Sequence, residues 1–378
     1  MRWMKEDRVP TGSTVVVAMS GGVDSSVAAA LLVEAGYTVV GITMHLWDFE
    51  GVGGNIHHES GCCSLSAMND ARMVCHRLGI PHYVVDFRDT FRETVIQDFI
   101  HEYARGRTPN PCVLCNVAIK WKALLWKVES LGGHWIATGH YARVRWDDTR
   151  ARFVLLRGVD KDKDQAYALW RLPQDALSKT LFPLGSAVKE WIREKARALD
   201  LKTAGKRESQ EICFVPDNDY ARFLWEKGRV GGRFPPTFGP GPIEDTRGHI
   251  LGYHRGVAFY TTGQRKGLGI ATGRPMYVTR IYPERNTLQV GGWDDLLGSE
   301  LIARDVNWIA VEEPMEPVRV EVQIRYRHMP APALVFPEEH GAVRVRFNAP
   351  QRAITPGQSV VFYQGDMILG GGIIEEQV

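Results

Sequence analysis

The sequence predicts an α/β fold: a doubly wound parallel sheet, followed by a small β-rich module and a C-terminal antiparallel β-barrel. Three observations support this prediction. The first 160 residues alternate apolar runs of strand length with helical stretches, as in parallel sheets covered by helices. Residues 228–273 contain 12 glycines and four prolines, a density that indicates tight turns. Later segments alternate apolar and polar residues, which is typical of antiparallel strands with one buried face.

Five apolar runs of strand length are expected to form the parallel sheet: residues 14–19, 38–44, 82–87, 134–138 and 153–156. Four helices are expected between the first four runs, at residues 25–35, 64–78, 90–104 and 116–128. Gly36 and Gly79 follow the first two helices in the position that a C-cap prefers, and Asp89 is expected to cap the third. Such sheets bind their ligands at the carboxyl ends of the strands.

The change in composition after residue 213 predicts a domain boundary near residue 215. We expect three domains: a catalytic domain of residues 1–214, a central β-rich domain of residues 215–291 that contacts a nucleic-acid partner, and a C-terminal β-barrel of residues 292–378. In the last domain, one face of a strand carries four apolar residues, Val318, Val320, Val322 and Ile324, and the other face carries Arg319, Glu321, Gln323 and Arg325. Further strands are expected at residues 343–347 and 359–363. Repeated alternation of this kind predicts an antiparallel barrel or sandwich, and we adopt the barrel.

Composition and charge exclude several classes of protein. Hydrophobic residues make up 44% of the 378 residues and charged residues 24%, which excludes wholesale disorder, collagen and a coiled coil. The formal net charge is +2, so a polyanionic partner must bind to a local basic patch. No stretch approaches about 18 uninterrupted apolar residues, and the start lacks the apolar core of a signal peptide. We therefore expect a cytoplasmic protein with reduced cysteines and no membrane contact.

The segment SGGVDSS, residues 20–26, lies between the first strand and the first helix. Gly21 and Gly22 let the backbone approach an oxyanion closely, and N–H groups at the start of the helix bind phosphate oxygens well. The serine hydroxyls add further donors. Asp24 would repel a phosphate unless a divalent cation bridges them, so we expect Mg²⁺ at this residue. The sequence contains neither GxxxxGK[ST] nor GxGxxG, which disfavours a Walker NTPase and a Rossmann dehydrogenase.

SGGVDS resembles the PP-loop of ATP pyrophosphatases, which split ATP between the α and β phosphates and adenylate an oxygen of their substrate. The resemblance implies that ATP is bound by this loop together with the ends of neighbouring strands. The residues implied in ATP binding are Ala18, Met19, Ser20, Gly21, Gly22, Val23, Asp24, Ser25, Met44 and Gly139.

The six cysteines lie in the first 213 residues. Cys112 and Cys115 form a CxxC motif in an expected loop between prolines, a spacing that suits a metal, a cluster or redox exchange. Cys115 also precedes an expected helix, whose N-terminal dipole would lower its pKa and favour the thiolate. Cys213, taken alone, has the surroundings of an ordinary core cysteine.

Several segments together resemble one family, the tRNA-specific 2-thiouridylases, which replace O2 of the wobble uridine, position 34, with sulfur. The segments are SGGVDSS, CCSLSAMNDAR, GRTPNPCVLCN, ATGHYAR, DKDKDQAY, ICFV, YTTGQRKGLGI and PQRAITPGQSVVFY. The resemblance implies that Cys115 is the catalytic thiol and that Cys213 carries persulfide sulfur. It further implies that Asn110, Pro111 and Cys112 line the target base. The residues implied in contacts with tRNA are His140, Lys163, Asp164, Gln165, Arg325, Tyr326 and Gln358. The implied partners are tRNA and a sulfur donor: a cysteine desulfurase, a sulfur-relay protein or free sulfide.

One position departs from the common pattern of this family, because many members carry an aspartate where this chain has Cys112. The departure leaves three candidate ligands for a [4Fe-4S] cluster, Cys112, Cys115 and Cys213, with one iron open for hydrosulfide. Cluster and persulfide routes remain equal alternatives on the sequence. The remaining cysteines, Cys62, Cys63 and Cys75, are expected to be structural.

Two other functions also remain open. Another PP-loop ligase or amidotransferase would need neither the CxxC motif with Cys213 nor the barrel. An RNA-binding module with a vestigial ATP site would form no AMP and pyrophosphate in response to tRNA.

Overall fold

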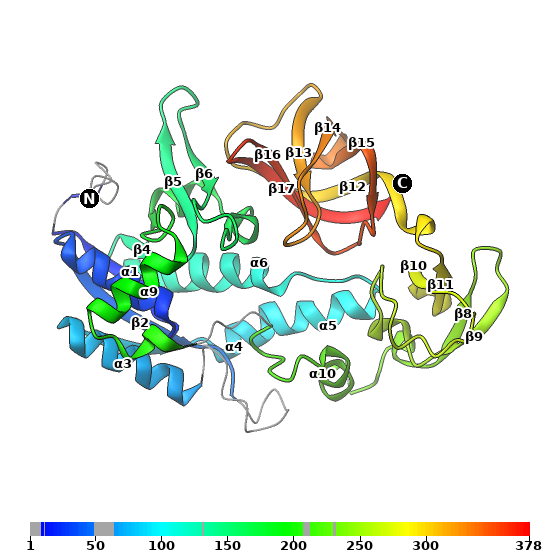
Figure 1. The fold of residues 1–378 in the computed structure, drawn as a ribbon, viewed down its shortest axis with the longest axis horizontal. Helices are drawn as coiled ribbons and strands as arrows, with labels where there is room; N and C mark the ends of the chain where they lie inside the picture. Colours follow the sequence, from blue (N-terminus) through cyan, green and yellow to red (C-terminus); the bar gives the residue numbers. More distant parts are fainter. Residues whose placement is uncertain (1–8, 11, 49–63, 131, 207–211, 230–231) are drawn as a thin grey trace. The chain divides into compact units, whose positions relative to one another are not determined.

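The computed structural model describes residues 9–10, 12–48, 64–130, 132–206, 212–229 and 232–378 (Figure 1). The chain divides into two compact units. The first unit comprises Met1–Val95, Cys112–Asn218 and Asp366–Ile368, and the second comprises Ile96–Pro111, Asp219–Gly365 and Leu369–Val378. Helix α5 Gln97–Ala104 therefore belongs to the second unit, although it precedes the CxxC motif of the first. The three-domain division expected from the sequence stays a prediction.

The first unit contains the expected parallel sheet, with the strand order β3-β2-β1-β4-β7 among the described residues. Its strands are β1 Thr14–Ala18, β2 Thr38–His45, β3 His82–Asp86, β4 Trp135–Ala137 and β7 Thr180–Leu181. All four pairings are parallel. The connecting helices include α1 Val23–Glu34, α3 Leu65–Leu78, α8 Gln174–Ser178 and α9 Lys189–Ala198. The prediction of an α/β fold with a parallel sheet is confirmed.

The prediction that residues 153–156 add a fifth parallel strand is wrong. This segment lies in β6 Arg152–Arg157, which pairs antiparallel with β5 Ala142–Asp147 across a tight turn. Met367 and Ile368, which belong to the same unit, pair with the other edge of β6. The apolar run is therefore a hairpin strand, and β7 takes the fifth place in the parallel sheet.

The helix between β2 and β3 follows its sequence signals closely. The Ser64 side chain accepts a hydrogen bond from Ala67 N at 3.0 Å, which caps the start of α3. Gly79 ends the helix with φ 67°, the left-handed conformation that a residue without Cβ adopts at least cost. Cys75 of this helix is fully buried against β2, and burial raises the pKa of its thiol to about 11. Such a thiol is inert, as expected of a structural cysteine. Cys62 and Cys63 lie outside the described residues.

Two other helical runs begin earlier than expected. The first runs through α4 Arg88–Phe91, a π-helical segment Arg92–Ile96 and α5 Gln97–Ala104, with Phe87 at the N-cap. Asp89 therefore lies in the first helical turn, and the prediction that it caps the helix is wrong. The second run comprises α6 Pro111–Cys115, a π-helical segment Asn116–Leu124 and α7 Leu125–Ser130.

The second unit contains α10 Tyr220–Lys227, a small sheet and the expected barrel. The small sheet has the order β10-β11-β8-β9, formed by β8 Gly241–Glu244, β9 Ile250–His254, β10 Tyr277–Tyr282 and β11 Thr287–Gly291. The barrel strands are β12 Leu297–Trp308, β13 Val318–Gln323, β14 Ala331–Pro337, β15 Val343–Arg352, β16 Ser359–Gln364 and β17 Met367–Gln377. Pairing of β12 with β17 closes the barrel, which leaves no open strand edge.

Short 3₁₀ turns connect many of these elements. The described ones are Ala166–Leu169, Lys202–Gly205, Pro236–Phe238, Val257–Phe259, Pro283–Arg285, Asp294–Leu296 and Glu339–Gly341. On β13, Val320 and Val322 are buried as predicted, but Gln323 is buried as well and donates to Arg325 O at 3.2 Å. In the part of the chain that the structure describes, no helix has the length and apolar character needed to cross a bilayer.

We expect the contact between Gly41 and Cys75 to limit the size of both residues. A Cβ added at Gly41 would lie 2.6 Å from Cys75 Sγ, so Gly41→Ala should lower the free energy of unfolding by about 1–3 kcal/mol. Urea denaturation measures this loss. In the Gly41→Ala/Cys75→Ala double variant the sulfur is absent, so most of the loss should be recovered relative to Cys75→Ala alone, with Met19 Cγ at 3.2 Å as the remaining close contact. Equal loss in both backgrounds would contradict this packing.

Candidate active site

The SGGVDSS loop is held in one conformation by its own hydrogen bonds. Ser25 Oγ accepts from Ser20 N at 3.2 Å, and Ser26 Oγ donates to Gly22 O at 2.8 Å. Gly21 has φ 66°, and a Cβ at this residue would overlap the Ala67 carbonyl of α3. The loop therefore joins β1 to α1 with its backbone already bent, as an oxyanion site at a helix N-terminus requires.

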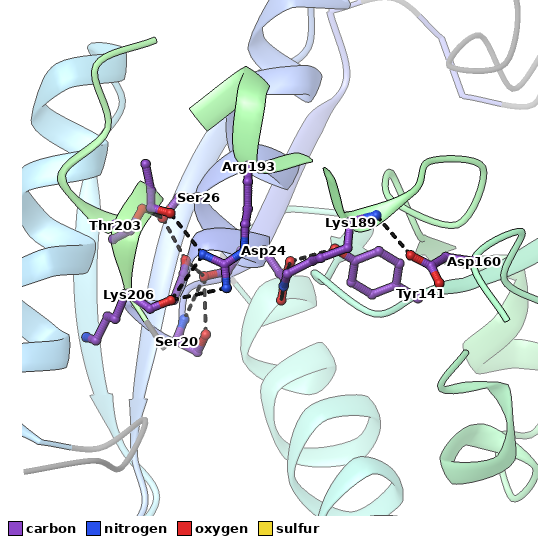
Figure 2. Close-up of polar contacts among 12 residues, drawn as sticks. Ser20, Asp24, Ser26, Tyr141, Asp160, Lys189, Arg193, Thr203 and Lys206 are labelled. Carbon is purple, nitrogen blue, oxygen red and sulfur yellow. Dashed lines mark hydrogen bonds and ion pairs between the residues drawn. The ribbon is translucent and has the colours of Figure 1, made fainter. Parts of the chain in front are cut away.

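Three residues from a distant part of the sequence surround this loop (Figure 2). Lys206 Nζ donates to Gly21 O at 3.0 Å and lies 2.8 Å from Asp70 Oδ2. Thr203 Oγ1 donates to Ser26 Oγ at 3.1 Å. Arg193 fixes the same segment, because its Nη1 donates to the carbonyl oxygen of residue 204 at 3.0 Å. These contacts place the Lys206 ammonium group, paired with Asp70, against the backbone of the loop.

Asp24, in the first turn of α1, has its charge balanced within the chain. Both of its carboxylate oxygens lie 2.8 Å from Lys189 Nζ, and Tyr141 OH donates to Oδ1 at 2.7 Å (Figure 2). The Lys189 side chain is only 6% exposed, so solvent screens this pair weakly. Charge compensation, the reason for expecting Mg²⁺ at Asp24, is thus supplied by Lys189. Both carboxylate oxygens are engaged by Lys189 in this structure, and Mg²⁺ at Asp24 stays a prediction.

The other residues implied in ATP binding gather at the same edge of the sheet. Ala18 and Met19 end β1, and Met44 lies near the carboxyl end of the parallel strand β2. Gly139 follows β4, where a Cβ would lie 2.8 Å from Asp24 C and Ser25 N. Glycine at position 139 therefore allows the segment after β4 to pack closely against the start of α1. The structure brings all the predicted ATP-binding positions together, while their contact with ATP stays a prediction.

Cys112 and Cys115 lie in helix α6 and not in a loop. Pro111 begins the helix, a position that proline favours, so Cys112 lies in the first turn and Cys115 one turn later on the same side. The stretch of helix nearest the N-terminus thus carries Cys112, which corrects the expectation for Cys115. Cys112 is exposed, while Cys115 and Cys213 are partly buried.

The three candidate cluster ligands are not assembled. Within the described residues, no three His, Cys, Asp or Glu side chains lie where they could hold one metal ion. Cys213 lies in a turn beside Phe214, whose ring packs against Phe91 at 5.7 Å between centroids. This arrangement does not fit a cluster held by Cys112, Cys115 and Cys213.

A polar chain connects the CxxC helix to the end of β4. Asn116 donates to Ala168 O at 2.9 Å and accepts from Lys120 Nζ at 2.8 Å. Lys120 Nζ lies 3.5 Å from His140 Nε2, and the other ring nitrogen of His140 lies 2.7 Å from Thr138 Oγ1. Burial, and then the charge of Lys120, hold the pKa of His140 well below its usual range. His140 is therefore neutral at pH 7, so any contact with RNA would be a hydrogen bond and not a charge pair.

Residues 163–165, which are predicted to contact tRNA, form hydrogen bonds that stabilise the turn in which they lie. Asp164 accepts hydrogen bonds from two main-chain N–H groups at 2.9 and 3.1 Å, and burial raises its pKa. Gln165 Oε1 accepts from Tyr141 N at 3.1 Å. Lys163 N donates to Asp160 O at 3.2 Å. The contacts of these three residues with tRNA stay predictions.

Within the second unit, Gln358 holds the segment that leads to Asn110 and Pro111. Its Nε2 donates to Thr108 O at 2.9 Å and to Pro109 O at 3.2 Å. The neighbouring Gly357 has φ 88°, and a Cβ there would lie 2.9 Å from Thr108 N. Gln358, predicted to contact tRNA, thus serves as a support for the segment of the target-base residues.

Arg107 secures the same segment through charge. Its Nε lies 2.7 Å from Glu102 and its Nη1 2.8 Å from Glu375, and the side chain is 12% exposed. A hydrogen bond from Nη2 to Ile374 O at 3.3 Å adds a third partner. The Arg107 side chain is largely shielded from solvent, so its contacts with Glu102 and Glu375 fix the backbone before residue 108.

The barrel presents Arg325 and Tyr326 differently. Arg325 Nη1 donates to Arg352 O at 2.9 Å. The Tyr326 ring is 46% exposed and lies 5.6 Å from the Arg327 guanidinium carbon. An exposed ring beside a cation suits stacking with a base, and this contact also stays a prediction.

Sequence reasoning missed Lys189, Arg193, Thr203 and Lys206. None of them lies in a motif. Lys189, Thr203 and Lys206 contact the loop from 165 to 185 residues further along the chain, and Arg193 supports the segment that carries Lys206. Only a parallel sheet that returns the chain to the same edge brings them there.

Three family models match successive parts of the chain. They are described as "tRNA methyl transferase HUP domain" for residues 13–217, "tRNA methyl transferase PRC-barrel domain" for residues 233–292 and "Aminomethyltransferase beta-barrel domain" for residues 298–374. Among solved structures, an NMN synthetase from Francisella tularensis is 16% identical with a TM-score of 0.33, covering 53% of this chain and 67% of that chain.

Relatives with much higher identity cover nearly the whole chain. A protein from Heliobacterium modesticaldum is 53% identical over 96% of this chain and 92% of its own length. One from Acetivibrio thermocellus is 51% identical over 96% and 99%, and one from Carboxydothermus hydrogenoformans 53% identical over 96% and 98%. Each is named tRNA-specific 2-thiouridylase MnmA. On this similarity, the chain belongs to the tRNA-specific 2-thiouridylase family.

Proposed function

We propose that this protein is a cytoplasmic, ATP-dependent sulfurtransferase that places sulfur at C2 of the wobble uridine of tRNA. The observation that carries the proposal is the pre-bent SGGVDSS loop, which shares one compact unit with three accessible or partly accessible cysteines. Two relatives that are 53% and 51% identical over 96% of this chain are named for this activity.

The loop suits the first step, in which uridine O2 attacks the α-phosphorus of ATP and pyrophosphate leaves. The main-chain N–H groups at the start of α1 receive the polyphosphate, and Lys206, paired with Asp70, holds the loop backbone at Gly21. Lys189 neutralises Asp24, so the loop does not repel the anion. The adenylated oxygen then leaves as AMP, a far better leaving group than a carbonyl oxygen.

The second step uses two thiols. Sulfur arrives as a persulfide on Cys213 from an external donor, and its terminal sulfur attacks C2 and expels AMP. The Cys115 thiolate then attacks the Cys213 sulfur, which releases the thiolated base and leaves a Cys115–Cys213 disulfide. A cellular thiol reductant restores both thiols. We favour this route over a cluster because it needs two thiols to meet during one step, whereas a cluster needs three ligands held at one point, and no such group of three lies in the described chain.

Replacing either proposed sulfur-handling thiol should abolish sulfur transfer without abolishing RNA binding. For Cys115→Ser and Cys213→Ser we expect the yield of 2-thiouridine to fall more than about 100-fold, since serine forms no persulfide or disulfide. Mass spectrometry of tRNA nucleosides after incubation with ATP, magnesium and a sulfur donor measures this. Cys112→Asp is the matched control, and the persulfide route predicts that it stays active. Loss of activity in Cys112→Asp together with iron and sulfide in the purified protein would favour the cluster. Full activity in Cys115→Ser would favour a PP-loop ligase.

Lys189→Met should expose the negative charge of Asp24 to ATP. Removing one partner of a fully buried ion pair costs about 3–5 kcal/mol in unfolding free energy. Because Asp24 is 29% exposed, we expect a smaller loss of about 2 kcal/mol. The KM for ATP should rise about tenfold through charge repulsion. Thermal unfolding and steady-state kinetics measure both effects. The Asp24→Asn/Lys189→Met double variant removes the repulsion, so it should recover stability and KM; an unrecovered double variant would refute this role of the pair.

Gln358→Glu should disturb catalysis more than RNA affinity. The change removes the N–H donor and faces two carbonyl oxygens with a carboxylate, so the segment before Asn110 shifts. We expect kcat to fall roughly 10- to 100-fold, as for a misplacement of about 1 Å, while the Kd for tRNA changes less than about threefold. Gln351→Glu is the control, because the side-chain amide of Gln351 donates to Ala349 O within its own strand. A fall in tRNA affinity that accounts for the whole loss would instead assign Gln358 to RNA contact.

A further inference from the structure

One segment of the second unit concentrates the positive charge of the protein. Residues 246–283 contain five arginines, one lysine and no aspartate or glutamate. These six charges compare with a formal net charge of +2 for all 378 residues. All residues of the segment are described, and they extend from the β8–β9 turn to the end of β10.

The connection between β9 and β10 encloses an open hollow of about 360 Å³. Arg265 and Arg274 line it and are exposed, and Thr272 adds a hydroxyl. Leu268 and Met276, which also line it, are buried. Among the described residues the structure shows no ion pair for either arginine, so both guanidinium groups are available to an anion.

The glycines around this hollow are required by the conformation of the backbone and not by close contact with neighbouring atoms. Gly267, Gly269 and Gly273 have φ of 78°, 69° and 68°, the left-handed region that other residues adopt only with strain. A Cβ at Gly269 or Gly273 would meet no atom within 4 Å, so the space beside them is open. In the described chain, no main-chain N–H of residues 265–276 donates to another protein group. Successive amides in such a bent backbone form a concave surface that binds oxyanions.

The ends of this connection are fixed to the sheet. Gly263 N donates to Val278 O at 2.7 Å, and Val278 N donates to Gln264 O at 2.9 Å. Gln264 also bonds to Thr261 N at 3.1 Å and to Lys266 O at 3.0 Å through its side chain. Hydrogen bonds thus fix both ends of the connection that carries the two arginines, which lowers the conformational entropy lost on binding.

We infer that this hollow is a second RNA-binding site, in which Arg265, Arg274 and the glycine-bent backbone bind phosphodiester groups of the RNA strand. The inference rests on the proposed function, which supplies RNA as the polyanion. Guanidinium forks and main-chain amides match phosphate oxygens, and open space beside glycines lets an RNA backbone approach closely. An acidic protein surface would also be attracted by charge, but it needs neither the bent amides nor the hollow.

The test is the binding of fluorescently labelled tRNA to the full chain by anisotropy between about 50 and 200 mM salt. For Arg265→Ala/Arg274→Ala we expect affinity at the lower salt to fall roughly 10- to 100-fold and the slope of log K against log salt to flatten by roughly 1.5. Arg247→Ala, an exposed arginine on the β8–β9 turn, is the matched control and should alter both quantities less. Arg265→Lys/Arg274→Lys keeps the charge and should retain most of the salt slope.

Further measurements separate the outcomes. Inorganic phosphate at the same ionic strength should compete weakly, because the site recognises successive phosphates of a strand; displacement of tRNA by phosphate alone would reduce the site to one for free phosphate. Unchanged tRNA affinity in the double alanine variant would overturn the inference while leaving the proposed function intact. Unchanged affinity with slower thiolation from a protein donor would also overturn it and assign the surface to that donor. A parent protein that neither binds nor thiolates tRNA would overturn the proposed function itself.

Discussion

The ion pair between Asp24 and Lys189 is the interaction on which the nucleotide edge depends. It joins the first turn of α1 to the first turn of α9, 165 residues apart, and it lets a loop designed for anions contain a carboxylate. Removing a charge from water costs several kcal/mol, which the pair recovers only with good geometry and further hydrogen bonds. Both oxygens of Asp24 contact Nζ, and Tyr141 supplies the additional bond. The loop, α9 and the β4 end are thereby fixed together before any ligand binds.

Local signals predicted most of the fold, and nonlocal pairing accounts for the errors. The apolar run of β1, the Ser64 and Gly79 caps of α3 and the alternation in the barrel are each encoded within a few residues. An apolar run such as residues 153–156 fits either a buried parallel strand or a hairpin, and only its partner decides. The site followed the same rule. The PP-loop motif is contiguous and was found, whereas Lys189 and Lys206 act across the fold and left no motif.

The residues expected at the RNA surface divide into two physical groups. Tyr326 is exposed with a cation at its ring, as a recogniser of an unstacked base should be. The side chains of Gln358, Asp164 and Gln165 form hydrogen bonds with the protein backbone and therefore fix the segments around them. Shaping and contact are compatible, because a side chain that fixes a loop also decides which face of that loop a substrate meets. The CxxC helix follows the same design, since Asn116 and Lys120 tie it to the end of β4.

The anchoring of Arg107 also has a consequence for biosynthesis. Its second partner, Glu375, is translated 268 residues later, so a growing chain contains the arginine and its first partner, Glu102, long before this second acceptor exists. At 5–20 residues per second, the ribosome needs roughly 10–50 s to supply that acceptor. Throughout this interval the nascent polypeptide has its CxxC motif without the bracing that orients the preceding segment. The segment before residue 108 therefore gains its full set of contacts only after the last barrel strand has been made.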